Sequence, residues 1–191
     1  MHYMNNKTET NDLLQQNYSR VAIFLHWLIA LMVMMNIVGG LLFSCNIILF
    51  SNQMLLHKQS GVIILALVIV RIIWRLSHEY PRLTGSIPAS EEVLAKFGQL
   101  LLYFLMLTVP LSGLIFVQSA GHNPTFAGYH LPILMPFLTA SDVPQLELLH
   151  TSLAIFFATL ILGHTIAALK HHFIDKKRVL VRILPKFLRR E

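Results

Sequence analysis

Four long apolar segments, divided by shorter polar stretches, are the main feature of the chain. They run over about residues 21–43, 55–76, 94–117 and 148–169. A helix needs about 20 predominantly apolar residues to cross the hydrocarbon core of a bilayer. The pattern predicts an all-α fold, an integral membrane four-helix bundle within residues 18–171. A polar N-terminal tail, residues 1–17, precedes this bundle, and a basic tail, residues 172–191, follows it.

The composition agrees with lipid as the solvent of this fold. Hydrophobic residues make up 55% of the chain and charged residues only 13%, whereas a soluble domain carries about 25% charged residues. The first apolar segment follows a polar start and no small-residue cleavage site comes after it, so we expect a retained span rather than a signal peptide. The single cysteine, Cys45, excludes an intramolecular disulfide and a cysteine-ligated iron–sulfur cluster.

Lysine and arginine gather in alternate connections, which predicts the topology. Before the first segment, between the second and third, and after the fourth lie Lys7, Arg20, Arg75, Arg82, Lys96, Lys170, Lys176, Lys177, Arg178, Arg182, Lys186, Arg189 and Arg190, whereas the other two connections offer only Lys58. Because basic residues favour the cytoplasmic side, both termini are expected in the cytoplasm. Topology thus accounts for the net charge of +6, and we expect the basic tail to lie on the anionic inner membrane surface rather than on nucleic acid.

The connection between the third and fourth segments carries four prolines, which argue against a long helix there. Its stretch from His130 to Leu138, HLPILMPFL, is nevertheless apolar. Two interpretations fit this stretch equally well. It is either a cap on the outer membrane surface that covers a pocket, or an ordinary loop in contact with lipid headgroups.

Four of the ten histidines lie within or at the edges of the apolar segments: His26, His57, His150 and His164. Ionisable residues in a membrane span are costly and indicate a functional site, although a single one can serve only as a hydrogen-bonding link between helices. With both termini on one side, His26 and His164 lie near the inner face, and His57 and His150 near the outer face. The depths therefore predict two pairs, His26 with His164 and His57 with His150.

The separation of His150 and His164 supports two stacked sites. Fourteen residues of helix rise roughly 21 Å and turn nearly four times, so both side chains point to about the same face. Paired histidines from facing helices suit haem iron, which takes one axial histidine on each side. Zinc prefers three or four ligands at one level. An ion relay usually recruits carboxylates inside the membrane, and all nine Asp and Glu residues lie at segment ends or in connections. The chain has no C-x-x-C-H motif, so any haem is expected to be held non-covalently.

Three further residues are candidates for haem contacts: Arg71, Lys58 and Gly61. Arg71 lies 14 residues after His57 and would bring a cation for haem propionates to the inner site, or else extend to the lipid headgroups. Lys58 adjoins the outer-site histidine. Gly61 lies four residues after His57 on the same face, where a glycine would let a flat macrocycle approach the helix. Gly163, next to His164, offers the same freedom, although such glycines are also common in ordinary membrane helix packing.

These residues resemble the bacterial cytochrome b561 family. The resemblance rests on YSRVAIFLHW around His26, on HKQSG from His57 with VRIIWR from Val70, and on GH at His164 with ALKHHF after it. It covers roughly residues 18–185. It implies a four-helix protein of the bacterial inner membrane with two haem b groups, whose axial ligands match His26, His57, His150 and His164.

The resemblance also implies electron exchange between the quinone pool and a partner. Some members oxidise superoxide at the outer face, whereas related cytochrome b subunits anchor dehydrogenases or hydrogenases and depend on a redox partner protein. The outer connections offer superoxide only one cation, Lys58, which weakens that assignment. The leading hypothesis is a di-haem b electron-transfer protein that acts on quinone, with superoxide as a candidate donor, and the cap from His130 to Leu138 is a candidate cover for the quinone. A haem-bearing anchor subunit and a histidine-dependent ion transporter are the alternatives.

Overall fold

The computed structural model describes residues 18–78, 88–126, 128–177, 179–185 and 188, and these residues contain four long helices. They are α2 (Arg20–Ser44), α3 (Gln53–Ser77), α4 (Ala89–Ser119) and α5 (Val143–Leu169). All four are long and apolar enough to cross a membrane. The predicted four-helix membrane bundle is therefore confirmed, while the predicted N-terminal tail, residues 1–17, lies outside the described residues.

The helices begin where the sequence offers helix-start signals. The Ser19 hydroxyl caps α2 by accepting a hydrogen bond from the Ala22 amide at 3.2 Å. Pro144 lies in the first turn of α5, where a missing amide hydrogen costs nothing. At its far end α5 continues into a π-helical turn, η2 (Lys170–Ile174). Such turns are rare and frequently occur at functional sites.

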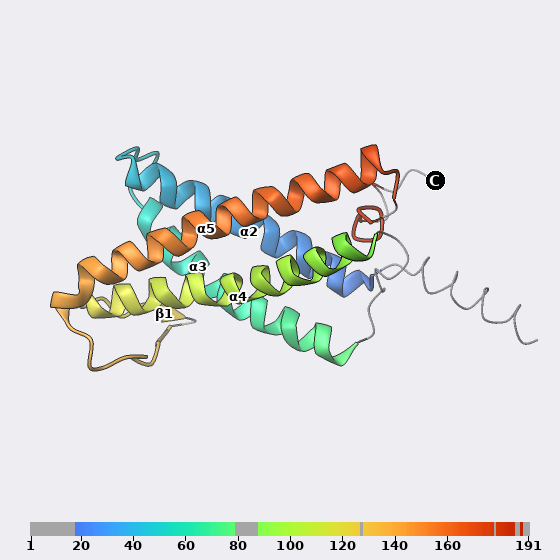
Figure 1. Cartoon of the computed structure of the whole chain (residues 1–191). Helices are drawn as coiled ribbons and strands as arrows, with labels where there is room; N and C mark the ends of the chain where they lie inside the picture. Colours follow the sequence, from blue (N-terminus) through green and yellow to red (C-terminus); the bar gives the residue numbers. More distant parts are fainter. Residues whose placement is uncertain (1–17, 79–87, 127, 178, 186–187, 189–191) are drawn as a thin grey trace, which may run out of the picture.

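The helices run alternately up and down (Figure 1), so the start of α2, the end of α3, the start of α4 and the end of α5 lie together. We call this the inner end, and the opposite one the outer end. Close packing joins α2 to α3, α3 to α4 and α4 to α5. Between α2 and α5, which are both described from end to end, close backbone approaches are few. The bundle is thus loosest along its α2–α5 side.

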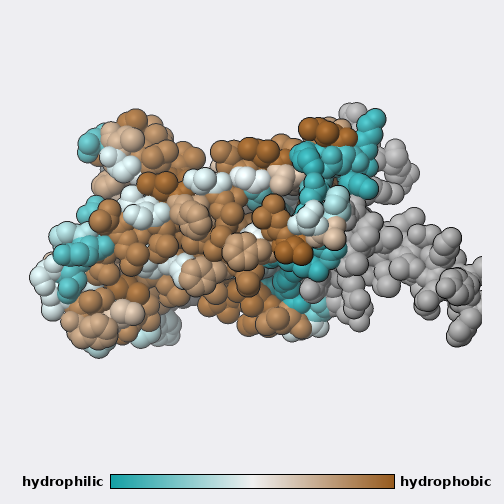
Figure 2. Space-filling view, in the orientation of Figure 1, coloured by the Kyte–Doolittle hydropathy of each residue, from teal (hydrophilic) through white to brown (hydrophobic). Residues whose placement is uncertain are grey.

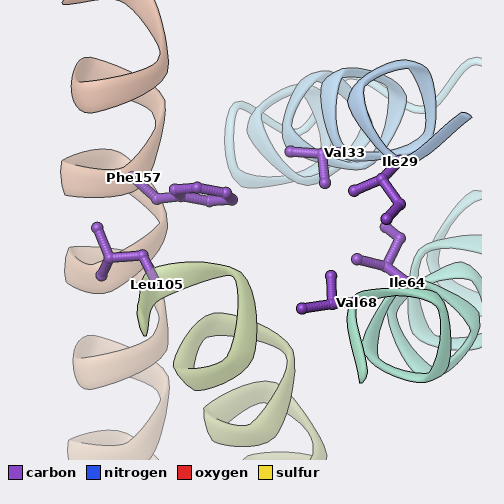
Figure 3. Close-up of a cluster of buried hydrophobic side chains, with 6 residues drawn as sticks. All are labelled: Ile29, Val33, Ile64, Val68, Leu105 and Phe157. Carbon is purple, nitrogen blue, oxygen red and sulfur yellow. The ribbon is translucent and has the colours of Figure 1, made fainter. Parts of the chain in front are cut away.

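A small apolar core holds the middle of the bundle together. Figure 3 shows its six buried side chains, with Phe157 of α5 pointing toward Val33 of α2: Ile29, Val33, Ile64, Val68, Leu105 and Phe157. Most other large apolar side chains of the helices face outward, and Figure 2 shows them as a broad hydrophobic belt with hydrophilic residues gathered toward the two ends. A belt of this size is unfavourable in water, so the surface agrees with a bilayer around the bundle.

The connection from α4 to α5 folds over the outer end. It contains a short antiparallel hairpin of β1 (Thr125–Phe126) and β2 (Tyr129–His130), and a 3-10 turn, η1 (Ala140–Asp142), just before α5. Gly128 turns the hairpin with φ +84°, a value that glycine adopts without strain. The side chain of Gln118 fixes the following stretch, because it donates to the Pro132 carbonyl at 2.9 Å and accepts from the Leu134 amide at 3.1 Å.

Candidate functional site

His57 and His150 meet near the outer end of the bundle. His57 lies in the first turns of α3 and His150 in the second turn of α5. Their ring centres are 6.3 Å apart and the ring planes are nearly perpendicular, at 80°. Both side chains are half-buried. The structure thus brings together the two histidines that the sequence placed at the outer level.

Each of these rings is held by a carbonyl of a third helix through Nδ1. His57 Nδ1 lies 3.1 Å from the Asn36 carbonyl of α2, and His150 Nδ1 lies 3.1 Å from the Val109 carbonyl of α4. Because a carbonyl only accepts, Nδ1 carries the proton in both rings and Nε2 keeps its lone pair. The Ser112 hydroxyl, 3.1 Å from His150 Nδ1, adds a second polar contact there. A carbonyl that accepts from one ring nitrogen orients the other for a metal, as in most metal-binding histidines.

The distance between the rings suits one metal ion between them. A bond from a histidine nitrogen to a metal is about 2 Å long, and the nitrogen lies about 1 Å from its ring centre, so two axial histidines hold their ring centres about 6 Å apart. The observed 6.3 Å matches this value.

Two glycines that the sequence did not connect with the site make room for these rings. A Cβ atom on Gly40 of α2 would lie 3.0 Å from Cε1 of His57, and one on Gly113 of α4 would lie 2.9 Å from Cε1 of His150. Both distances are shorter than a normal carbon–carbon contact. One signal was available in the sequence, because Gly40 follows His26 by 14 residues (40 − 26), the separation that also relates His150 to His164.

The inner level contains His26, His164 and Arg71. Arg71 lies within electrostatic range of both histidines, and His164 lies within range of His26. The His26 ring also contacts the Trp27 ring edge-on, with centres 5.4 Å apart. The structure therefore brings Arg71 and the two inner histidines together, and places His26 on α2 opposite His164 on α5.

The other sequence candidates are Lys58 and Gly61, on the same helix as His57, and Gly163, which adjoins the inner His164. Lys58 is half-buried and lies within electrostatic range of His57. A Cβ atom on Gly61 would meet only the Asn36 side-chain amide, at 3.6 Å, and one on Gly163 would meet nothing within 4 Å. Their contact with a cofactor stays a prediction.

The described residues 179–185 of the basic C-terminal tail lie against the inner end of the bundle. The Trp27 indole donates to the Ile183 carbonyl at 2.9 Å, and the Tyr18 amide donates to the Arg182 carbonyl at 3.4 Å. Arg182 is only 7% exposed. This part of the tail is therefore packed against the start of α2. Its contact there, Trp27, is the residue after His26.

An ionic cluster joins the start of α4 to the end of α5 at the same end. Lys170 donates to Glu91 at 3.1 Å and to Asp175 at 2.9 Å, and Asp175 also accepts from His171 at 2.8 Å. The hydrogen bond from Lys170, and then that from His171, holds the pKa of the Asp175 carboxyl below its usual value. Glu91, His171 and Asp175 have the residue types of a metal site, but the Lys170 ammonium already supplies the cation between the carboxylates.

A small pocket lies beneath the stretch from His130 to Leu138. Its volume is about 150 Å³, and it is lined by Ile115, Gln118, Ser119, Ile133, Met135, Pro136 and Leu138. Of the two interpretations of this stretch, the pocket supports a cap over the outer end of α4.

Comparison with known proteins places this site in a family. The family model for prokaryotic cytochrome b561 matches residues 17–186, nearly the whole chain. The chain belongs to the prokaryotic cytochrome b561 family. Its resemblance to that family, inferred from the histidine motifs, is confirmed.

Three known proteins are similar in sequence to this b561 protein. Cytochrome b561 homolog 1 of Escherichia coli (strain K12) is 27% identical over 176 residues, which cover 88% of this chain and 97% of that protein. Cytochrome b561 homolog 2 of the same organism is 31% identical over 133 residues, 69% of this chain and 70% of that protein. A Yersinia pestis protein named probable superoxide oxidase CybB is 26% identical over 176 residues, 91% of this chain and 98% of that protein.

Membership makes the chain a bacterial integral membrane haem protein of electron transport, and the residues present fit haem b. Such a haem takes two axial imidazoles, and His57 and His150 offer these from two helices. Backbone carbonyls hold Nδ1 of each ring, and a glycine lies against each ring. When bound, haem supplies an iron that changes its charge by one electron; the protein supplies ligands, spacing and a dry environment.

Proposed function

We propose that this b561 protein binds two haem b groups and transfers electrons between the quinone pool and a redox partner in the bacterial inner membrane. One haem lies near the outer face between His57 and His150, and the other near the inner face between His26 and His164. The observation that carries the proposal is the nearly perpendicular, carbonyl-oriented ring pair of His57 and His150, with centres 6.3 Å apart.

The inner pair supports a second haem by different evidence. His26 and His164 come from α2 and α5, two helices with few close backbone approaches to each other. A bundle that is loose on this side has space for a flat macrocycle. Arg71 provides a cation at this level for the propionate carboxylates. Fourteen residues of α5, roughly 21 Å of rise, separate the two levels.

The topology follows from the distribution of charge. The inner end carries the basic tail and the ionic cluster around Lys170, so we assign the inner end and both termini to the cytoplasm. The outer histidine pair then lies close to the opposite face, where Lys58 is the nearest basic residue in the sequence.

For the electron donor we propose superoxide, because the Yersinia pestis relative is named a probable superoxide oxidase. Lys58 beside His57 offers one positive charge to an anionic donor. For the acceptor we propose quinone, with its headgroup in the pocket under the cap. Gln118 in that pocket follows Gly113, the glycine behind His150, by five residues, roughly 7.5 Å of helix rise.

The number of haems and the ligand pairs are tested together. The purified protein is expected to be red, with a b-type spectrum and two haems per chain. Replacing His26 or His164 by alanine is expected to remove one haem signal, and replacing His57 or His150 the other. His122→Ala, an exposed histidine of the α4–α5 connection, is the control that retains both. A colourless folded protein, or loss of the same haem in His26→Ala and His150→Ala, would contradict the assignment.

The reaction is tested on the isolated chain. We expect superoxide to reduce quinone through it, and we expect deletion of residues 130–138 to slow quinone reduction while both haems remain bound. If the red, pure chain neither oxidises superoxide nor reduces quinone, but does so with co-purifying subunits, it is a membrane anchor of a larger complex. Unchanged quinone kinetics after the deletion would remove the pocket from the mechanism.

A further inference from the structure

Two arginines of α3 lie close to one tyrosine ring of α4 in the inner half of the bundle. Arg71 and Arg75 are one helical turn apart, and their guanidinium carbons lie 5.7 Å and 5.4 Å from the centre of the Tyr103 ring of α4. Arg71 also donates from Nε to the Tyr103 hydroxyl at 3.2 Å. Tyr103 therefore contacts Arg71 in two ways, through its ring and through its oxygen.

Two arginines one turn apart within an apolar helix cost free energy unless other groups stabilise them. Charged side chains within apolar helices are expensive, and like charges four residues apart on a helix repel each other. The helix that carries both arginines, α3, has no acidic residue of its own. The face of an aromatic ring attracts cations, so the Tyr103 ring offsets part of the repulsion and keeps the two guanidinium groups in place.

The two arginines differ in their distance from the inner histidines. Arg71 lies within electrostatic range of both His26 and His164. Arg75 lies one turn, about 5.4 Å of rise, nearer the inner end of α3, where it donates to the Gln99 side chain at 3.2 Å. A group bound between His26 and His164 would therefore experience the charge of Arg71 more strongly than that of Arg75.

We propose that Tyr103 is a positioning residue that holds the Arg71 guanidinium beside the inner haem and thereby raises that haem's reduction potential. The inference rests on the proposed function, since it requires a haem between His26 and His164. Reduction adds one electron and lowers the charge of the site by one. A fixed cation stabilises that lower charge, and it does so strongly because the helices exclude water. Without its tyrosine, the long Arg71 side chain is free to turn toward the lipid headgroups.

A redox titration of the purified holoprotein, followed by absorption spectra of the two haems, tests this role. Arg71→Gln is expected to reduce the equilibrium constant for reduction of the inner haem by about tenfold, or 59 mV for one electron. Tyr103→Phe keeps the ring and removes only the hydroxyl, so we expect a shift in the same direction of about threefold. Arg71→Lys preserves the charge and should restore most of the potential.

Matched variants separate positioning from general disturbance. Arg75→Gln removes the same charge one turn away and is expected to shift the inner haem less than Arg71→Gln does. Tyr129→Phe changes a tyrosine of the outer hairpin that is 80% exposed, and it should shift neither haem. In the Arg71→Gln background, Tyr103→Phe is expected to add no further shift, because coupled residues are non-additive.

The outcomes distinguish this inference from the proposed function. If both haems are present and Tyr103→Phe leaves the inner potential unchanged, the positioning role is wrong and the di-haem assignment stands. If Tyr103→Phe shifts the potential equally with and without Arg71, the tyrosine does not act through the arginine. If His26→Ala and His164→Ala each retain both haems, the proposed function fails first, and the inference fails with it.

Discussion

Replacing Gly113 by alanine tests the outer histidine pair most directly. The added Cβ would lie 2.9 Å from Cε1, 3.2 Å from Nδ1 and 3.4 Å from Nε2 of His150. Favourable carbon–carbon contacts begin at about 3.5 Å, so the ring must withdraw by about 0.6 Å or α4 must move away from α5. Either movement changes the position of His150 relative to His57.

The expected cost follows from two terms. Overpacking of this kind costs about 1–3 kcal/mol. The hydrogen bond from His150 Nδ1 to the Val109 carbonyl is already 3.1 Å long, near the upper limit for N–H···O geometry, and its loss adds about 0.5–1.5 kcal/mol. Together the two costs come to about 1.5–4.5 kcal/mol. Since about 1.4 kcal/mol corresponds to a factor of ten in affinity, we expect the outer haem to bind about 10- to 1000-fold more weakly.

The assay is a haem titration of the purified variant, with the ratio of haem to protein and the separate spectral signals of the two haems as readouts. Gly40→Ala, with its Cβ 3.0 Å from Cε1 of His57, is expected to weaken the same haem from the other side. Gly39→Ala and Gly98→Ala are matched controls on α2 and α4, because a Cβ at either position meets nothing within 4 Å. Both controls are expected to retain two haems.

Retention of both haems with unchanged affinity in Gly113→Ala and Gly40→Ala would refute the reasoning. It would mean that the two rings need not occupy the positions in which Nδ1 reaches the carbonyls. Equal losses in all four variants would instead indicate a general effect of alanine on these helices, and the close approach at Gly113 would then have no special part in the site.

Three further predictions concern the bundle and its inner end. Leu105→Ala removes a side chain that is 1% exposed and should lower the free energy of unfolding by about 2–5 kcal/mol. The control Leu100→Ala, at a position 68% exposed on the same helix, should change this free energy little. Equal losses in a detergent unfolding titration would contradict the core assignment. Trp27→Phe removes the indole donor to the Ile183 carbonyl, so trypsin should cleave faster after Lys176 and Lys177, and an unchanged rate would mean that this bond does not hold the tail. Asp175 has a folded-state pKa below its usual value because of Lys170 and His171. Its contribution to stability is therefore present above the unfolded pKa of about 4 and is lost as the pH falls through the lower folded value. Thermal unfolding should separate Asp175→Asn from the parent protein at pH 7, and the difference should shrink as the pH falls below about 4; a difference that does not change with pH would refute this.

The sequence predicted the four helices well because membrane-spanning helices are decided locally. A continuous apolar stretch has no other way to satisfy its backbone in lipid, so length and hydropathy suffice. The helices extend beyond the predicted spans: α4 begins at Ala89, ahead of the span from about Leu94, and α5 begins at Val143, ahead of the span from about Leu148. Polar first turns can lie outside the hydrophobic core of a bilayer. The meeting of His57 with His150 was also predictable, since helix rise and alternating direction fix the depth of each residue.

Other parts of the site depend on how each helix is rotated about its axis, which hydropathy does not determine in a bundle surrounded by lipid. The rotation of α2 and α4 decided that Gly40 and Gly113, rather than Gly61 and Gly163, lie against the histidine rings. It also decided which carbonyls reach Nδ1, and that the Tyr103 ring lies close to both Arg71 and Arg75. The sequence by itself determined the elements, their depths and the histidine levels, because these follow from composition and from distance along one chain. The tertiary structure alone decided which helix faces hold the rings and the arginine, because side-chain packing between helices far apart in the sequence selects them.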